Sequence, residues 1–154
     1  MIKEVDDKDL WRALDLVNRV FSEFVAVDYS QQGIDTFESY LKNKLQEVSA
    51  AMKSGDKKVW AYYQGGEILG VIATQSTSHI SLMFVDKRYH RQGIARQLFN
   101  VALDWFKQND VAQITVNSSP YAVKAYEQLG FLQTDEQQEK DGITYLPMMR
   151  PCEL

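Results

Sequence analysis

The sequence contains very little cysteine, histidine and proline. Cys152 is the only cysteine among the 154 residues, so the chain cannot form an internal disulfide, and a reducing compartment such as the cytoplasm is the simplest expectation. The two histidines, His79 and His90, have no cysteine pair beside them, which argues against a His/Cys zinc site, and we expect no metal. No repeat and no Pro/Gly-rich linker interrupts the chain, and its length suits one domain over residues 1–154.

Long apolar runs are also absent. The longest unbroken stretches, such as 82–85, are far too short to span a bilayer. The first seven residues contain no apolar segment of the kind that a secretory signal needs. We therefore expect neither a membrane partner nor export.

The net charge is −4, and one segment opposes it. Between Asp86 and Gln97 one acid stands beside four cations, a local balance of 4 − 1 = +3, which leaves −4 − 3 = −7 for the rest of the chain; the cations are Lys87, Arg88, Arg91 and Arg96. An acidic protein is a poor nucleic-acid binder, so we expect no nucleic-acid partner. The basic focus suits a small anionic ligand, although a solvated helix end would look the same.

Hydrophobic periodicity predicts the element order β α α β β β α β α β β. This order indicates an α/β (α+β) fold with a mixed, mostly antiparallel central sheet of six to seven strands, flanked by four helices on both faces. The first helix should bury a stripe that includes Trp11, and a capping-box pair, Asp35 and Glu38, should open the second. The expected strands cover 2–5, 59–63, 68–74, 79–85, 114–116, 131–134 and 143–149, and the expected helices 7–24, 35–52, a third from residue 92, and 122–129.

The most informative segment runs from the strand ending at Val85 through a charged turn to Gly93 and a helix. A helix N-terminus offers unpaired N–H groups and a partial positive charge, which attract phosphate. Gly93 lacks the Cβ that would hold a ligand away from the backbone, and Arg91 and Arg96 can add charged hydrogen bonds. The segment is neither a P-loop nor a dinucleotide-binding fingerprint.

The segment His90-Arg91-Gln92-Gly93-Ile94-Ala95 resembles the acyl-CoA motif of the GNAT (GCN5-related) N-acetyltransferase family, Gln/Arg-x-x-Gly-x-Gly/Ala. His90 departs from the pattern at its first position. The family uses mainly backbone amides of this loop, so the departure affects a side-chain contact more than the site. The resemblance implies an acetyl-CoA site formed by Phe84, Val85, Arg91, Gln92, Gly93, Ile94, Ala95 and Arg96.

A second segment, 117–131, resembles the family's Asn-x-x-Ala-x-x-x-Tyr-x-x-x-Gly-Phe region. Tyr126 occupies the position of a tyrosine that lies beside the CoA sulfur in relatives and can protonate the departing thiolate. The asparagine that often touches the cofactor is replaced by Ser119, and Asn117 is a candidate substitute. The alternative for Tyr126 is a helix tyrosine packed on the sheet.

The resemblance implies direct transfer of an acetyl group to a primary amine, with no covalent intermediate. Many relatives carry a catalytic glutamate where this chain has Ser81, so the base is open, and His79 is the nearest candidate. The acceptor, a small-molecule or peptide amine, should meet the segment between the first two helices, where the candidates are Glu23, Asp28 and Tyr29. Two alternatives remain: a non-catalytic acyl-CoA-binding regulator, and a homodimer in place of a monomer.

Overall fold

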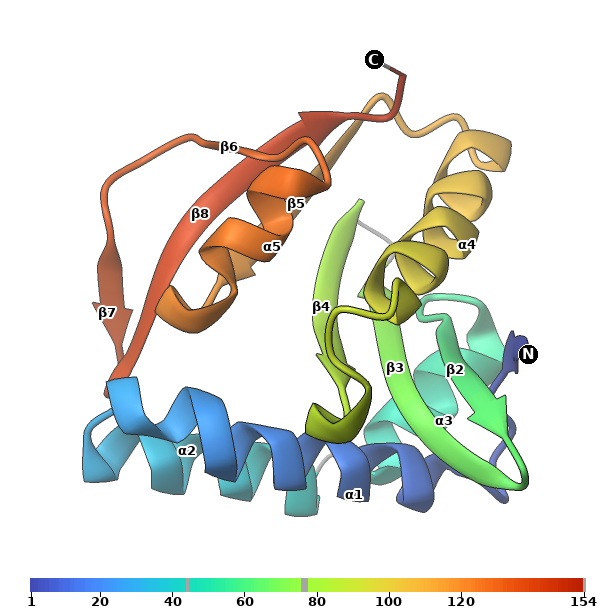
Figure 1. The fold of residues 1–154 in the computed structure, drawn as a ribbon, viewed down its shortest axis with the longest axis horizontal. Helices are drawn as coiled ribbons and strands as arrows, with labels where there is room; N and C mark the ends of the chain where they lie inside the picture. The colour runs from blue at the N-terminus through green and yellow to red at the C-terminus, as the bar shows by residue number, and fades with distance from the viewer. Residues whose placement is uncertain (44, 76–77, 154) are drawn as a thin grey trace.

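The computed structural model describes residues 1–43, 45–75 and 78–153, without the side chains of residues 24, 28, 42, 45 and 46. Figure 1 shows the arrangement of the helices and strands. The strands are β1 (Ile2–Glu4), β2 (Val59–Gln64), β3 (Glu67–Gln75), β4 (His79–Val85), β5 (Gln113–Ser118), β6 (Leu132–Gln133), β7 (Gln138–Lys140) and β8 (Ile143–Pro151). The helices are α1 (Leu10–Val20), α2 (Gln31–Asn43), α3 (Leu45–Ser54), α4 (Ile94–Gln108) and α5 (Val123–Gln128). Short π- and 3₁₀-helices are η1 (Phe21–Val25), η2 (Ala26–Asp28), η3 (Lys87–Tyr89) and η4 (Pro120–Ala122).

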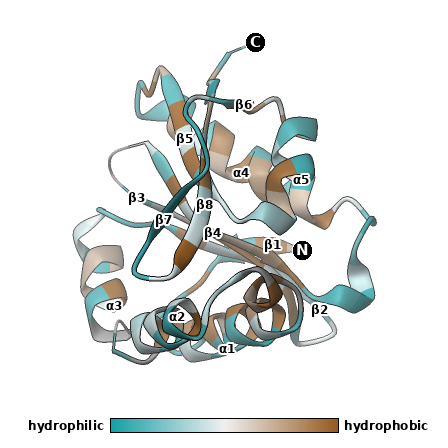
Figure 2. Cartoon of the chain, turned by 90° about the vertical axis from the view of Figure 1, so that its left-hand side faces the viewer, coloured by the Kyte–Doolittle hydropathy of each residue, from teal (hydrophilic) through white to brown (hydrophobic). Residues whose placement is uncertain are grey.

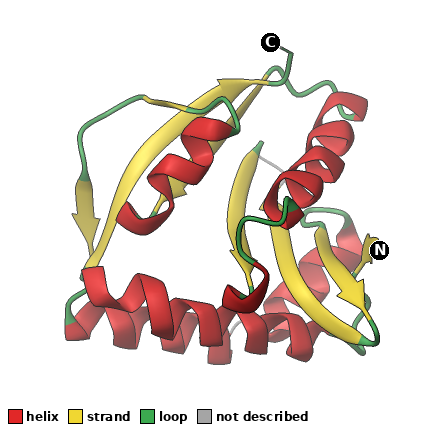
Figure 3. Cartoon of the chain, in the orientation of Figure 1, coloured by secondary structure: helices red, strands yellow, loops and turns green. Residues whose placement is uncertain are grey.

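One mixed sheet organises the molecule, with the strand order β1-β2-β3-β4-β5-β8-β6 and β7 paired to β8. Every pair is antiparallel except β4 and β5. These two strands run parallel and pair only through His79 with Thr115 and Ile80 with Val116. Beyond this vertex they diverge, so the sheet opens into a V (Figures 1 and 3). The predicted fold class is confirmed.

Two hydrophobic cores lie on opposite faces of the sheet (Figure 2). Along β2 the side chain of Trp60 joins the core under α4 and α5, whereas its neighbours Val59 and Ala61 join the core under α1, α2 and α3. This alternation follows from the two-residue period of a strand. Strands buried on both faces explain why the central part of the chain reads as nearly continuous apolar sequence.

A bulge interrupts β4 at Ser81. Ala73 pairs with Leu82 but Thr74 pairs with Ile80, so Ser81 is an extra residue on β4. Its hydroxyl donates a hydrogen bond to the carbonyl of Ala73 at 3.3 Å. A bulge reverses which face the following side chains use. Accordingly Ile80 packs in the core under α4, whereas Leu82 packs in the core under α1.

The N-terminal helix differs from the prediction in two ways. It begins at Leu10 and passes at Phe21 into the π-helix η1, so it is shorter than the predicted span 7–24. Trp11 is 61% exposed, and its placement in the buried stripe was wrong. The buried side of α1 is centred on Ala13 and Val17, and a 3.6-residue period places Trp11 nearly opposite that centre.

The second predicted helix is two helices, α2 and α3. Helix α2 begins four residues early, at Gln31, and the hydroxyl of Ser30 accepts a hydrogen bond from the amide of Gly33 at 3.2 Å. The predicted capping pair, Asp35 and Glu38, therefore lies inside α2, and that prediction was wrong. With strand β7, which the sequence did not suggest, the described residues form eight strands and five α-helices.

Candidate active site

The opening between β4 and β5 forms a slot in the sheet. After the vertex pair formed by Ile80 and Val116, the described part of β4 is paired only with β3, through residues 82–85. Backbone N–H and C=O groups on the slot side of β4 therefore have no partner strand. Such groups are strong donors and acceptors that another extended chain can satisfy.

The loop after β4 turns its backbone into a cradle at the start of α4. Arg91 and Gly93 both have left-handed backbone conformations, with φ of 63° and 81°. Gly93 is the N-cap of α4 and makes no side-chain capping bond, so the first N–H groups of the helix are unpaired. A Cβ added to Gly93 would meet no protein atom nearer than Gln97 Nε2, at 3.9 Å. The space over these amides is open to an anion.

Asp86 fixes the conformation of the loop through hydrogen bonds and ion pairs. Its side chain is buried, and it accepts hydrogen bonds from the amide of Arg88 at 2.9 Å and from the Arg88 guanidinium at 3.0 and 3.2 Å. Arg19 on α1 lies 3.6 Å away. The hydrogen bonds from Arg88 hold the pKa of Asp86 below its usual range. Asp86 therefore stays ionised and fixes the turn that leads into the cradle.

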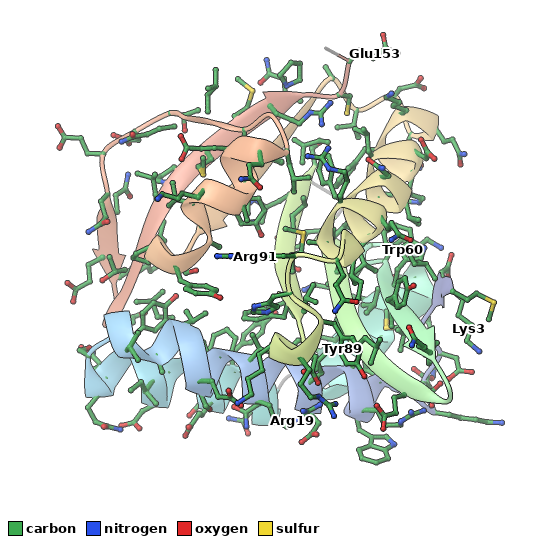
Figure 4. All side chains as sticks on the ribbon, viewed as in Figure 1. Lys3, Arg19, Trp60, Tyr89, Arg91 and Glu153 are labelled. Carbon is green, nitrogen blue, oxygen red and sulfur yellow. The ribbon has the colours of Figure 1, made fainter. Side chains whose placement is uncertain are left out.

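Three of the four cations of the basic segment are engaged within the protein. Lys87 pairs with Glu23 of η1 at 2.9 Å, and Arg88 pairs with Asp86. Arg96 donates to the carbonyl of Gln128 at 3.0 Å. Arg91 alone of the four makes no hydrogen bond or ion pair within the described residues, and Figure 4 shows it extending from the loop in front of β4. Arg91 is therefore the best placed of them to meet a phosphate.

His90, the departure from the family motif, bonds to the strand end. Its Nε2 lies 2.7 Å from the carbonyl oxygen of Val85, a distance at which the ring N–H donates to the carbonyl. Of the other cofactor candidates, Gln92 is exposed, Ile94 is buried and Ala95 is partly buried. The loop is thus held by His90 and Asp86 while its amides stay open.

Tyr126 lies on α5 with its ring buried. The ring packs edge-on against Phe131, with 5.5 Å between centroids, and only 4% of the residue is exposed. Its hydroxyl makes no hydrogen bond within the described residues. Every fully buried side-chain polar atom among these residues has a hydrogen-bond partner, so the Tyr126 hydroxyl is not a fully buried atom. The exposed fraction therefore includes the hydroxyl. Burial raises the pKa of Tyr126 far above its ordinary value, so the phenol stays protonated and can donate.

Two arginines hold the C-terminal end of α5. Arg150, which is 8% exposed, donates to the carbonyl of Leu129 at 2.9 Å, and Arg96 donates to that of Gln128. The Arg150 guanidinium also lies 5.2 Å from the ring centroid of Phe99. Cations suit the carbonyl end of a helix. No feature of the sequence around Arg150 indicated this role.

The two-residue spacing between His79 and Ser81 is interrupted by the bulge, in which Ser81 is the extra residue. His79 lies at the vertex of the V, where its Nδ1 is 2.8 Å from the hydroxyl of Thr115. Burial, and secondly the charge of Lys57, lower the pKa of His79. The imidazole is therefore biased towards its neutral, proton-accepting form.

Asn117 and Ser119 occupy different environments. On β5 the residues 114, 116 and 118 are buried, whereas Asn117 lies on the alternate, exposed side together with Thr115. That side faces away from the core under α4 and α5. Ser119 follows the strand and is partly buried. The structure thus separates these two candidates, and Asn117 faces the side of α1 and α2.

The acceptor candidates lie on η1 and just after it. Glu23 is already paired with Lys87. The ring of Tyr29 packs edge-on against Phe21, which stacks on Phe37 at a centroid distance of 4.0 Å. The side chain of Asp28 lies outside the described residues. Phe84 joins the same cluster, 6.3 Å from Phe37, so it faces the helices α1 and α2 and not the core under α4.

Comparisons with known proteins agree with this geometry. The sequence profile of the acetyltransferase (GNAT) domain matches residues 25–151. The chain belongs to the GNAT family. The prediction of an acetyl-CoA-dependent N-acetyltransferase is thereby confirmed at the level of the family. No curated protein matches the sequence.

Solved structures share the GNAT fold at low sequence identity. A GCN5-related N-acetyltransferase from Rhodopseudomonas palustris superimposes with a TM-score of 0.80 at 16% identity, over 98% of this chain and 94% of that one. The PaiA N-acetyltransferase from Thermoplasma acidophilum, in complex with coenzyme A, gives 0.80 at 14% identity over 98% of both chains. An aminoglycoside 6'-N-acetyltransferase complexed with coenzyme A gives 0.70 at 12% identity, over 99% and 97%.

Two further observations concern this GNAT protein. Within the described ranges no helix is both long and apolar enough to cross a membrane. The same residues contain no group of three or more His, Cys, Asp or Glu side chains arranged to hold a metal ion.

Proposed function

We propose that this enzyme binds acetyl-CoA in the slot between β4 and β5 and transfers the acetyl group directly to an amine. The observation that carries the proposal is the slot itself, which leads to the open amides at Gly93. The pyrophosphate would bind these amides and Arg91, and the extended pantetheine arm would pair with the free backbone of β4. We further propose that residues 1–154 act as one domain in the cytoplasm.

In the proposed reaction the amine nitrogen attacks the thioester carbonyl. The C–N bond forms, the C–S bond breaks, the amine loses a proton to a base, and the CoA thiolate leaves. Unpaired N–H groups of β4 near the bulge at Ser81 would polarise the carbonyl. The hydroxyl of Tyr126 would donate a hydrogen bond to the thiolate as it departs. Because its pKa is raised, this phenol gives up its proton only together with C–S cleavage.

The base would be His79, acting through water from the vertex of the V. Its lowered pKa and its position beside β5 support this role. No carboxylate exists between His79 and Val85, so β4 itself supplies no other base.

We propose a cationic amine as the acceptor. The segment 20–41 contains four acids and no lysine or arginine, and the segment 133–149 contains four acids and Lys140, a balance of 1 − 4 = −3. The first segment covers the α1–α2 connection and most of α2, and the second runs from the end of β6 through β7 into β8; the two meet at Gly33 and Gly142. Negative charge on both sides of the slot raises the local concentration of cations. The aromatic rings of Tyr29 and Phe37 add surfaces that a cation can approach.

The decisive experiment combines binding with turnover. Acetyl-CoA at about a hundred times its dissociation constant should stabilise the protein by roughly 2.7 kcal/mol, and free thiol should appear when amines are added. Gly93→Val should raise the Kd of acetyl-CoA by about a hundredfold, because its side chain would fill the cradle. Gly66→Val is the matched control, since Gly66 has the same φ of 81° in an open turn with nothing within 4 Å. Binding without thiol release for any amine would favour the acyl-CoA-binding regulator.

A further inference from the structure

A second bulge interrupts the sheet, on β3. Tyr62 of β2 pairs with Gly70, whereas Tyr63 pairs with Ile68, so Leu69 is the extra residue on β3. The side chain of Leu69 lies in the core under α4, and a Cβ added to Gly70 would point to the same helix. Two successive residues of β3 therefore address one face of the sheet, which a regular strand does not allow.

The glycine at this bulge lets the first turns of α4 pack close to the sheet. A Cβ added to Gly70 would lie 2.9 Å from Cδ1 of Leu98 and 3.0 Å from Cγ2 of Ile94. Both distances are shorter than ordinary van der Waals contact, which begins at 3.4 Å. Gly70 itself is buried, and Figure 1 shows α4 lying across β3. The helix therefore occupies the space that a side chain at position 70 would need.

The same part of β3 holds the end of β4. Gly70 pairs with Val85, and the amide of Asp86 donates a hydrogen bond to the carbonyl of Leu69 at 2.8 Å. The bulge is thus bonded to the last residue of β4 and to the first residue of the loop that leads to Gly93. In the proposed complex the pantetheine arm pairs with β4 and the pyrophosphate meets the amides at Gly93. One place on β3 therefore sets the distance between these two parts of the cofactor site.

A side chain at position 70 would displace the end of the helix and not the strand. Strand β3 is hydrogen-bonded to both β2 and β4, and its residues 68–74 are buried. Leu98 can turn the end of a flexible side chain away, whereas Ile94 is β-branched and has one strongly preferred rotamer in a helix. Because Ile94 is the first residue of α4, moving it also moves the unpaired amides next to Gly93.

We propose that Gly70 is a positioning residue for acetyl-CoA. By leaving room for Ile94, it places the N-terminus of α4 where the amides at Gly93 meet the pyrophosphate. Gly70 touches no substrate and acts only through the first turn of α4. This inference rests on the proposed function, because it concerns how tightly that site holds the cofactor. A residue of β3 thereby controls the affinity of a site that β4 and α4 form.

The test variant is Gly70→Ala. Gly70 has no positive φ, so alanine adds no backbone strain and only the contact with α4 opposes it. In a calorimetric titration the Kd of acetyl-CoA should rise by about tenfold or more, the scale of one hydrogen bond to a charged group.

The matched control is Ala102→Val, which overpacks the core under α4 about two and a half turns away from Gly93. Ala102 is fully buried, and the Kd of its variant should stay within about twofold of the wild-type value. An unchanged Kd in Gly70→Ala, or an equal rise in both variants, overturns the proposal.

Ile94→Ala tests whether the effect passes through the end of the helix. It removes Cγ2, so adding Gly70→Ala to Ile94→Ala should change the Kd by less than about twofold, whatever Ile94→Ala does by itself. A full tenfold effect in that background overturns the proposal. If Gly70→Ala alone does not fold, the double variant should fold and bind as Ile94→Ala does, because the contact is relieved. A double variant that also stays unfolded overturns the proposal.

Ligands with and without phosphates separate this inference from the proposed function. S-acetylpantetheine contains the thioester arm but no pyrophosphate, so Gly70→Ala should reduce the preference for acetyl-CoA over S-acetylpantetheine by about tenfold. A protein that is only destabilised would keep this preference. A wild type that releases no thiol with any amine but shows this dependence on Gly70 would refute the proposed transfer and retain the positioning role. A wild type that turns over an amine while Gly70→Ala keeps the preference would refute the positioning role alone, and a wild type that binds neither ligand would refute both.

Discussion

The two halves of the V-shaped sheet differ in how they are covered. In β3 seven consecutive residues, 68–74, are buried, because α4 packs on one face and α1 on the other. In β5 buried and exposed residues alternate strictly, because only the face towards α4 and α5 is covered. We call the half with β3, which is covered on both faces, the closed half, and the half with β5, which leaves Thr115 and Asn117 exposed, the open half. Substitutions in the core of the closed half should therefore act mainly on stability, whereas Tyr126 on α5 of the open half is the proposed proton donor.

The largest effect should come from the open half, at Tyr126. Tyr126→Phe keeps the ring against Phe131 but removes the hydroxyl, so kcat should fall by about 10²–10⁴ while the Kd of acetyl-CoA and the melting temperature stay nearly constant. Steady-state rates and calorimetric titration of both proteins measure this. Full activity in the variant would mean that solvent protonates the thiolate and that Tyr126 only packs. Joint loss of binding and stability would instead indicate a structural role.

The closed half should respond to substitution in the opposite way. Ile72 is fully buried in the core under α4, and Ile72→Ala should lower the free energy of unfolding by about 2–5 kcal/mol. The molecules that remain folded should keep the wild-type kcat. Gln113→Ala on the exposed side of β5 is the matched control, and its effect on stability should stay within about 0.5 kcal/mol. Denaturant titration of Ile72→Ala and Gln113→Ala measures the free energy of unfolding of each variant. Equal losses would show that the closed half and the exposed side of β5 do not differ in their contribution to stability.

Arg150 should show an intermediate effect, because it joins the open half to α5. Arg150→Met leaves the carbonyl of Leu129 without its buried donor and should cost about 1.5–3 kcal/mol of unfolding free energy. Arg96→Ala removes an exposed bond to Gln128 and should cost less than about 1 kcal/mol. Both should lower kcat more than they raise the Kd of acetyl-CoA, since they hold the helix that carries Tyr126. If Arg96→Ala raised the Kd of acetyl-CoA more than it lowered kcat, Arg96 would instead be a residue that binds a phosphate of the cofactor.

The sequence predicted the fold well in segments whose hydrophobic residues follow a single period, either that of a helix or that of a strand. The hairpin around Gly65, the strand ending at Val85 and the helix after Gly93 all appear near their predicted positions. The sequence could not predict the bulge at Ser81, because a bulge depends on pairing with a strand that precedes it in the chain. The sequence also did not predict β7, because its polar residues show no alternation of apolar and polar side chains and the strand forms by pairing with β8.

From the sequence, only the two segments that match motifs of the family could be predicted as parts of the candidate site. The loop around Gly93 and the helix of Tyr126 came from their resemblance to the family. The partners of the charged side chains came from tertiary contacts: Lys87 meets Glu23, and Arg96 meets the end of α5. A run of cations is visible in a sequence, whereas the pairing of each cation is not. This is why the structure leaves Arg91 as the phosphate candidate among four.

The smallest effect should come from His79, at the vertex where the two halves join. Burial and Lys57 lower its folded-state pKa below the ordinary value of about 6.5. The unfolded chain therefore binds the proton more readily than the folded one. The contribution of His79 to stability is fully present above the unfolded pKa and is lost as the pH falls through the folded pKa. Neutral imidazole is also the form that can accept a proton from the amine.

For wild type, kcat/KM should therefore fall on acidification through the folded pKa of His79. His79→Gln should remove this limb and lower the rate above it by at most about tenfold, because water can take over part of the proton transfer. The amine titrates in the same way with both proteins, so the ratio of their kcat/KM values across pH isolates His79. A constant ratio would show that His79 only packs against Thr115 at the vertex, and that both halves of the sheet leave deprotonation of the amine to solvent.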